Sequence, residues 1–384
     1  MVCNNVDWDS LFSYQTVKIV RIRDKRLGIL HLSFMGAIIL YIVIVTILLQ
    51  QQYLAIQTPI GSIRNSLLAP ANRSQYLPYC QNSTNLNYNG FPTKECQYWD
   101  ETLVMYPPSS EYSLFITTRV SSSTQETFNN CSLTEFNCTY VNVANSTKDF
   151  YIADVDTFTV LVDHTMAAPT LGIQYNAKQL PGFMLNSKGK KITLTPPNIV
   201  GVVDQYDILT LDAILNAADI ASLDSPGFSN SSRSIRDDGM LLFCFITYSN
   251  TFTYSTSKYR YTYEFHLIED TKFKIVEPIY LDDVNHRYIF NRHGVRIIFI
   301  QTGQLGKFDF QTSLLTFVSG IGLLTVATLV VDIIAVRLLP QRNKYSMMKY
   351  QDSGLKRKPL LGDSETIEPE TPNQKDESGN IIIH

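Results

Sequence analysis

The second of two long apolar stretches contains side chains that can do chemistry inside a membrane. Small or hydroxylated residues are frequent in and around it: Ser313, Thr316, Ser319, Gly320, Gly322, Thr325, Ala327 and Thr328. Such residues let helices approach closely or face water, as in the wall of a pore. Asp332 lies near the end of the stretch. A carboxylate inside a membrane indicates function, but Arg337 follows closely, so Asp332 can instead face the cytosolic interface.

Motifs for catalysis are missing from the sequence. It has no His-Glu-x-x-His, no Cys-x-x-Cys, no glycine-rich phosphate loop and no Gly-x-Ser-x-Gly. We interpret the histidines of the central region, which lack metal-ligand spacing, as surface or hydrogen-bonded residues. We therefore expect no enzyme, no metal site and no cofactor. The net charge of −3 over 384 residues gives no indication of a nucleic-acid partner.

Two apolar stretches define the class of protein. Residues 27–49 contain no charge, and residues 311–339 form the second stretch. Each exceeds the roughly 20 residues that a helix needs to cross a bilayer. The first is too long for the apolar part of a signal peptide and has no small-residue cleavage site after it. We therefore predict two transmembrane helices in contact with membrane lipid.

Basic residues indicate how the chain crosses the membrane. Those before the first stretch are Lys18, Arg21, Arg23, Lys25 and Arg26, and those at and after the end of the second are Arg337, Arg342, Lys344 and Lys349. Positive charge favours the cytosolic side. Residues 1–26 and 340–384 are therefore expected to be cytosolic tails, the second largely disordered. Residues 50–310 are expected to lie outside the cell or in a lumen.

Glycosylation sequons agree with this topology. They occur at Asn72, Asn82, Asn130, Asn137, Asn145 and Asn230, all within residues 50–310. A glycan acceptor must be on the lumenal side. The same region contains five of the six cysteines. We expect the local pairs Cys80–Cys96 and Cys131–Cys138, with Cys244 left as a small apolar residue.

The central region is predicted to be β-rich. Residues 258–270 alternate between apolar and polar side chains, which is the period of a half-buried strand. Further segments rich in β-branched and aromatic residues predict strands at 112–120, 157–163, 240–248 and 294–302. Residues 211–223 are the best helix candidate in the region.

Short motifs occur in a fixed order along the chain. They are Tyr14-x-Thr16-x-Lys18, Gly294-Val-Arg296, Gly306-Lys-Phe-Asp309, Asp332 and Tyr345-x-x-x-Lys349. In these motifs and their spacing the chain resembles the ionotropic ATP receptors (P-two-X purinoceptors), which are trimeric ATP-gated cation channels. The resemblance covers about residues 8–350. It implies a regulatory N-terminal motif, a trafficking motif at Tyr345 and Lys349, and two spans around a glycosylated β-rich domain.

The ATP site of that family is altered here. The family binds the phosphates with two lysines after the first span, an Asn-Phe-Arg strand, and a lysine before its Gly-Ile-Arg. In our alignment these positions hold Ser66 and Leu68, then Arg260-Tyr261-Thr262, then Asn291. The adenine-contacting threonine is kept as Thr159. Arg260, Arg292 and Arg64 are candidates to restore the charge; the alternative is that they are solvated and the site is weak or lost.

The sequence therefore predicts a homotrimeric cation channel gated by ATP or another nucleotide. The resemblance maps the pore onto Ser319, Gly322 and Leu323, with Thr316 on the approach, and implies Na⁺, K⁺ and Ca²⁺ as permeant ions. One alternative is a silent or modulatory subunit that has lost ATP binding. Another is a two-span glycoprotein receptor of the scavenger type without a pore. Animal members of the family that the chain resembles have about ten cysteines between the spans. The five here therefore imply a divergent, protist-like member, in the plasma membrane or in an intracellular (contractile or endolysosomal) vacuole membrane.

Overall fold

The computed structural model describes residues 24–81, 87–108, 111–227, 232–250, 259–281, 283–340 and 342–349. The chain divides into two compact units, one of residues 1–40 and 321–384 and the other of residues 41–320. Several sequence predictions lie outside the described residues, namely those for Tyr14, Thr16, Lys18, Asn82 and Asn230.

Two long apolar helices coincide with the two predicted stretches. Helix α2 (Lys25–Tyr41) continues into the π-helical segment η1 (Ile42–Leu49), and α6 covers Phe310–Arg337. The first run has 25 residues and the second 28, and both are apolar enough to cross a bilayer. A short helix, α7 (Arg342–Lys349), follows α6.

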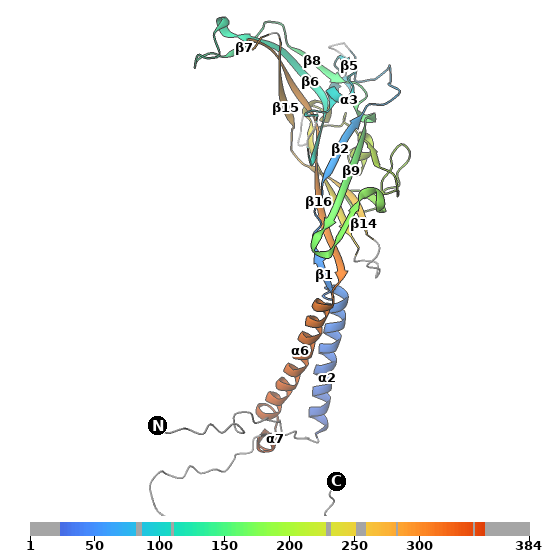
Figure 1. Ribbon diagram of the computed structural model, residues 1–384, viewed down its shortest axis with the longest axis vertical. Helices are drawn as coiled ribbons and strands as arrows, with labels where there is room; N and C mark the ends of the chain where they lie inside the picture. The colour runs from blue at the N-terminus through green and yellow to red at the C-terminus, as the bar shows by residue number, and fades with distance from the viewer. Residues whose placement is uncertain are drawn as a thin grey trace, which may run out of the picture. The chain divides into compact units, whose positions relative to one another are not determined.

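A ten-stranded sheet forms most of the β-rich unit. Its main path is β11 (Gly182–Leu185), β14 (Arg260–Ile268), β13 (Met240–Ser249), β16 (His286–Phe308), β6 (Ser113–Thr127), β8 (Lys148–Ile152) and β5 (Cys96–Gln97). Beside this path, β1 (Leu54–Gln57) and β15 (Lys274–Tyr280) pair with β16, and β7 (Tyr140–Asn142) pairs with β6. Strands β5 to β8 gather at the end of the unit farthest from β1 (Figure 1).

A second sheet has four strands. They are β10 (Ile173–Asn176), β9 (Thr159–Ala168), β12 (Asp207–Thr210) and β2 (Ile63–Leu68), which pairs with β9. Helix α4 (Leu211–Ala217) follows β12, and Thr210 caps it by accepting a hydrogen bond from the Ala213 amide. The smaller elements are β3 (Asn87–Tyr88), β4 (Phe91–Pro92), α3 (Glu101–Val104), α5 (Ile235–Asp238), η2 (Phe128–Asn130), η3 (Val155–Thr157), η4 (Pro169–Leu171) and η5 (Ala177–Gln179).

The alternating patterns explain why the strands form. In β14 the side chains of Tyr261, Tyr263 and Phe265 are buried, while those between them are partly exposed, as the period of two predicts. All five predicted strand segments overlap strands, and the predicted helix overlaps α4. Both predicted disulfides are confirmed, Cys80–Cys96 and Cys131–Cys138, and Cys244 is buried as a free thiol.

Candidate ligand site and pore segment

The outer face of β2 and β9 contains the residues expected to contact a nucleoside. In the antiparallel pair, Leu68 lies opposite Thr159 and Ser66 opposite Leu161. The Thr159 hydroxyl donates a hydrogen bond to the Leu68 carbonyl at 3.4 Å. Val160 and Val162, between the outward residues of β9, are buried. This alternation leaves a continuous surface on which Leu161 and Leu68 are apolar and Thr159 is polar.

A hollow of about 800 Å³ opens on the same face. Arg64, Ser66, Glu111, Leu161, Asp163 and Tyr206 are among the residues lining it. Arg64 lies directly opposite Asp163 in the strand pair. One guanidinium therefore shares this hollow with two carboxylates, which does not favour a polyphosphate. The face is better suited to a base and sugar than to the phosphates.

The structure does not place Arg260 beside Asn291. Strand β14 begins at Arg260 and pairs with β13, which separates it from β16. Arg260 lies opposite Ser249 and donates a hydrogen bond from Nε to the Ser249 hydroxyl at 3.4 Å. Phosphate ligands must converge to act together. The expectation that Arg260-Tyr261-Thr262 takes the place of the family's Asn-Phe-Arg strand is therefore not supported.

Asn291 lies instead between β6, where Ser121 is opposite it, and β15, where Val276 is opposite it. Lys272-Phe273-Lys274 stands at the start of this strand, and Lys274 lies opposite His293. Both lysines are exposed, Lys272 with 70% of its side chain accessible. The period of two that predicts β14 ends at Asp270, so it gives no indication of these two lysines. The sequence pattern that could have indicated a phosphate site here is Lys272-Phe273-Lys274, two cations on either side of one aromatic residue.

Phe273 fixes the direction of these lysines. Its ring packs edge-to-face against Phe115 with centroids 5.3 Å apart, and the Arg296 guanidinium carbon lies 4.9 Å from its centroid. Its amide donates to the Asp238 carbonyl at 3.3 Å, and its own carbonyl accepts from the Gly294 amide at 3.4 Å. With the phenyl ring turned into the sheet, the side chains on either side of it point to solvent.

Arg292 has a structural position, contrary to its expected role as a ligand contact. Its residue exposure is 2%. Its guanidinium forms an ion pair with Glu277, donating from Nε to Oε2 at 2.6 Å, and it also donates to the Leu103 carbonyl at 2.6 Å. The rings of Trp99 and Tyr106 each lie 5.0 Å from its guanidinium carbon. These contacts hold the charge inside the protein, so Arg292 does not face a ligand.

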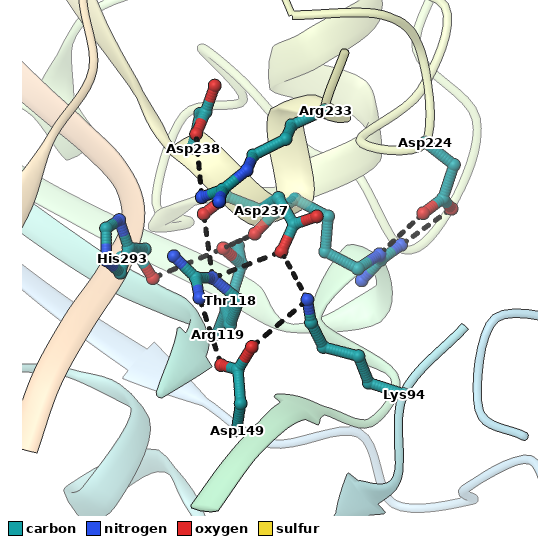
Figure 2. Close-up of polar contacts among 10 residues, drawn as sticks. Lys94, Thr118, Arg119, Asp149, Asp224, Arg233, Asp237, Asp238 and His293 are labelled. Atoms are coloured by element: carbon teal, nitrogen blue, oxygen red, sulfur yellow. Dashed lines mark hydrogen bonds and ion pairs between the residues drawn. The ribbon is translucent and has the colours of Figure 1, made fainter. Parts of the chain in front are cut away.

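Asp237 lies in a partly buried cluster of charged residues (Figure 2). Asp237 binds Lys94 at 2.9 Å and Arg119 at 3.2 Å, and Asp149 binds the same two cations. Asp238 extends the cluster to the surface through Lys272, at 2.9 Å. The charges alternate in sign, so each buried ion has a partner.

Arg236 and His293 complete the surroundings of this cluster. Arg236 is fully buried, with Asp224 and Asp156 within 2.7 and 2.9 Å of its guanidinium. The Thr118 hydroxyl donates to the carbonyls of Arg236 and His293, which ties α5 to β16 (Figure 2). Burial, and then the positive charge of Arg119, lower the pKa of the His293 imidazole to about 4.

On helix α6 the residues expected to line a pore are exposed, whereas a separate stripe is buried. Ser319, Gly322 and Leu323 are exposed. The buried stripe consists of Gly320, Ala327, Val331 and Ala335. Thr316 lies between the two, and its hydroxyl donates to the carbonyls of Gln52 and Thr312 at 2.8 and 2.9 Å. Asp332 is partly buried next to this stripe.

Tyr345, the first residue of the motif that ends at Lys349, is buried within its unit. It lies on α7 with 5% exposure, and its hydroxyl donates to the carboxylate of Asp24. That hydrogen bond lowers the pKa of Asp24 and raises the pKa of Tyr345. Lys349 ends the helix, and its side chain lies outside the described part. The motif tyrosine therefore contacts the start of the first span.

Four predicted glycan acceptors lie on the surface of the β-rich unit. Asn72, Asn130, Asn137 and Asn145 are all exposed.

His164 is fully buried, and its Nδ1 shares a hydrogen bond of 2.6 Å with the Tyr248 hydroxyl. Among the described residues no cluster of His, Cys, Asp and Glu has the arrangement of a metal site.

These features define a two-span membrane protein with a β-rich unit between the spans, whose second span presents small and polar residues. The family model described as ATP P2X receptor matches residues 12–152 and 231–352. P2X receptor E of Dictyostelium discoideum is 61% identical over 352 residues, covering 91% of this chain and 90% of the relative. P2X receptor A of the same organism is 47% identical, covering 90% and 91%.

The chain belongs to the P2X receptor family, and its function is that of an ATP-gated cation channel subunit. Among solved structures, an invertebrate P2X receptor from the Gulf Coast tick, obtained with ATP and Zn²⁺, matches with a TM-score of 0.52 and 14% identity. That match covers 79% of this chain and 99% of the tick protein. The chicken P2X7 receptor channel with TNP-ATP matches with a TM-score of 0.50, 14% identity, and coverage of 79% and 98%. These structures agree in fold.

Proposed function

We propose that three copies of this chain form a channel for Na⁺, K⁺ and Ca²⁺ that opens when ATP binds between neighbouring subunits. One observation carries the location of the ligand: Lys272 and Lys274 stand on either side of the packed Phe273, beside the strand that carries Asn291. A polyphosphate needs several cations at close quarters. The segment Lys272–Lys274 supplies two cations without Arg260 or Arg292.

The two halves of the site belong to different sheets. Thr159, Leu161 and Arg64 are on the four-stranded sheet, whereas Lys274 and Asn291 are on the ten-stranded sheet. The first half suits adenosine, and the second suits phosphates. We assign the first half to one subunit and the second to its neighbour, so that each trimer has equivalent sites at its interfaces.

Opening follows from preferential binding to one conformation. ATP that bridges two subunits stabilises the arrangement in which both halves converge, and the channel opens if that arrangement is the open one. Two spans per chain cannot enclose a pore, so three copies of α6 are needed. Ser319, Gly322 and Leu323 are assigned to the pore, with Thr316 on the approach and Asp332 near its cytosolic end.

The domain limits follow this assignment. Residues 1–26 and 340–384 are cytosolic, residues 27–49 and 311–339 span the membrane, and residues 50–310 face outside or a lumen. Tyr14, Thr16 and Lys18 belong to the cytosolic gating apparatus, and Tyr345 with Lys349 to the trafficking motif. Both a plasma membrane and an intracellular vacuole membrane fit this topology.

The test is electrical. The full chain is expressed alone, millimolar ATP is applied to the face that carries residues 50–310, and current is recorded for the parent, Lys272→Ala and Lys274→Ala. Each lysine variant is expected to raise the half-maximal ATP concentration about 10- to 100-fold, the range for lost charge-assisted hydrogen bonds. Lys190→Ala, an exposed lysine of another loop, and Arg260→Ala are the controls.

Two results would contradict the proposal in different ways. Equal ATP responses in all four variants would exclude the segment Lys272–Lys274 as the phosphate site. No current from chains that are trimeric and present in the recorded membrane would instead identify a silent subunit. ATP binding to the purified trimer, measured in parallel, distinguishes a chain that does not bind ATP from one that binds ATP but does not open.

A further inference from the structure

The loop between β6 and β7 combines a disulfide with two glycosylation sequons. Cys131 and Cys138 are bonded to each other, seven positions apart. Each is the middle residue of a sequon, Asn130-Cys131-Ser132 and Asn137-Cys138-Thr139. The other sequons with a described acceptor, at Asn72 and Asn145, contain no cysteine. One covalent bond therefore constrains two acceptor sites at once.

Groups of the disulfide-closed ring that a glycosyltransferase must recognise form hydrogen bonds within the ring. The acceptor motif requires a hydroxyl two residues after the asparagine. In the ring, the Ser132 hydroxyl shares a hydrogen bond of 2.8 Å with the Thr134 hydroxyl and accepts one from the Thr134 amide at 3.3 Å. The Cys131 and Cys138 amides donate to the carbonyls of Phe128 and Glu135 at 3.1 and 3.2 Å. At the first sequon Asn130 has a left-handed backbone, with a φ of 54°, so this acceptor is not in a fully extended segment.

We propose that closure of this ring limits glycosylation at Asn130 and Asn137, so that oxidation and glycan transfer compete during synthesis. In oxidation the two thiols lose two protons and two electrons to an oxidised thiol–disulfide carrier of the lumen. In transfer, Asn Nδ2 bonds to the anomeric carbon of a lipid-linked oligosaccharide, its amide loses a proton and the lipid diphosphate leaves. The ring is short, and its two thiols meet early because closing a small loop costs little entropy.

The competition determines what the loop presents to its surroundings. Phe136 and Leu133 belong to the chain segment between the two cysteines. Phe136 is fully exposed, at 102% of its reference area, and Leu133 is 45% exposed. Glycans on the flanking asparagines would cover these apolar side chains. Chains whose ring closes first leave them uncovered.

Single cysteine substitutions separate ring closure from the identity of the middle residue. Cys138→Ala opens the ring but leaves Asn130-Cys131-Ser132 unchanged, and Cys131→Ala leaves Asn137-Cys138-Thr139 unchanged. The full chain is made in a eukaryotic cell, and occupancy of each acceptor is measured by mass spectrometry after enzymatic deglycosylation in heavy-oxygen water. Asn72 and Asn145 are the internal standards, and Cys244→Ala is the control for loss of an unrelated thiol.

We expect low occupancy at Asn130 and Asn137 in the parent, with a severalfold rise at Asn130 in Cys138→Ala and at Asn137 in Cys131→Ala. A pulse of dithiothreitol during synthesis of the unchanged chain should raise both, which provides a test without any variant. Equal occupancy of Asn130 in the parent and in Cys138→Ala, with Asn72 glycosylated, would overturn the proposal. Absence of glycan at every acceptor would overturn it too, because the loop would then not meet the transferase.

Discussion

The Lys272 ammonium lies 2.9 Å from a carboxylate oxygen of Asp238. The lysine side chain is 70% exposed and the aspartate side chain 8%. A phosphate that binds Lys272 therefore competes with a carboxylate fixed at the edge of the buried cluster. Asp238 thus lowers the availability of one of the two cations assigned to the ligand.

Asp238→Asn should increase apparent ATP affinity. Exposed ion pairs contribute little, so the half-maximal ATP concentration is expected to fall by up to about fivefold. Asp149→Asn is the matched control, because Asp149 binds Lys94 and Arg119 in the same cluster and has no assigned ligand cation. Dose–response curves for the three channels decide the matter. A higher half-maximal concentration in Asp238→Asn would mean that Asp238 orients Lys272 for the ligand instead of competing with it.

Stability should depend on the protonation of His293. Its pKa is lowered from 6.5 to about 4, so between these values the unfolded chain binds a proton that the folded chain does not. The free energy of unfolding therefore falls as the pH decreases through this window. Above pH 6.5 both states are neutral at His293, and the stability is not reduced by this residue. The Tm of the purified protein should decline from pH 6.5 towards 4, and less steeply in His293→Gln. His266→Gln, whose side chain is 39% exposed, is the control; identical slopes in the parent and His293→Gln would contradict this assignment.

Local patterns in the sequence predicted local structure correctly. The period of two over residues 258–270 identified β14, because a half-buried strand needs alternation. The cysteine pairs were predictable because each joins neighbouring stretches of chain. The pairing of β15 with β16 was not, since nothing in an isolated strand specifies its neighbour. The motif alignment alone therefore predicts Arg260, and not Lys272 and Lys274, as a phosphate contact.

Arg292 on β16 is a second residue whose surroundings the sequence does not predict. Val295, Ile297 and Phe299 are buried, so alternation puts Arg292 on the other face of β16. From the sequence alone, that face is open to a ligand. In the fold, Leu103 and the rings of Trp99 and Tyr106 contact it, and these residues are far away in the sequence.

Arg292→Met should destabilise the protein without changing ATP affinity. Removing one partner of a buried ion pair leaves Glu277 unpaired, a loss of about 3–5 kcal/mol. Thermal unfolding and the yield of trimer measure this loss. Changing both residues, as in Arg292→Met with Glu277→Leu, should recover part of it because no charge remains unpaired. A large rise in the half-maximal ATP concentration of surviving Arg292→Met channels, at normal stability, would restore Arg292 as a ligand contact.

Substitutions of Asp24 and Tyr345 should have the same, non-additive effect on trafficking. The motif tyrosine is buried and bonded to Asp24, so its effect is expected to pass through this contact. Tyr345→Phe and Asp24→Asn should each reduce the amount of channel at its membrane by a similar factor, and the double variant should lose no more than either alone. Surface labelling with an epitope between the spans measures all four proteins. Reductions that multiply in the double variant would show that the two residues act separately.

The two stripes of α6 should differ in their access to water. Ser319 and Leu323 are exposed and assigned to the pore, whereas Ala327 and Ala335 are 2% and 3% exposed. In Ser319→Cys and Leu323→Cys, a positively charged methanethiosulfonate applied together with ATP should reduce the current irreversibly, because a permeant cation path admits the reagent. Ala327→Cys and Ala335→Cys, on the same helix, should retain their current because packing covers the thiol. Equal modification at the two stripes would remove Ser319 and Leu323 from the pore, and modification of Ala327→Cys alone would assign the pore to the stripe now buried.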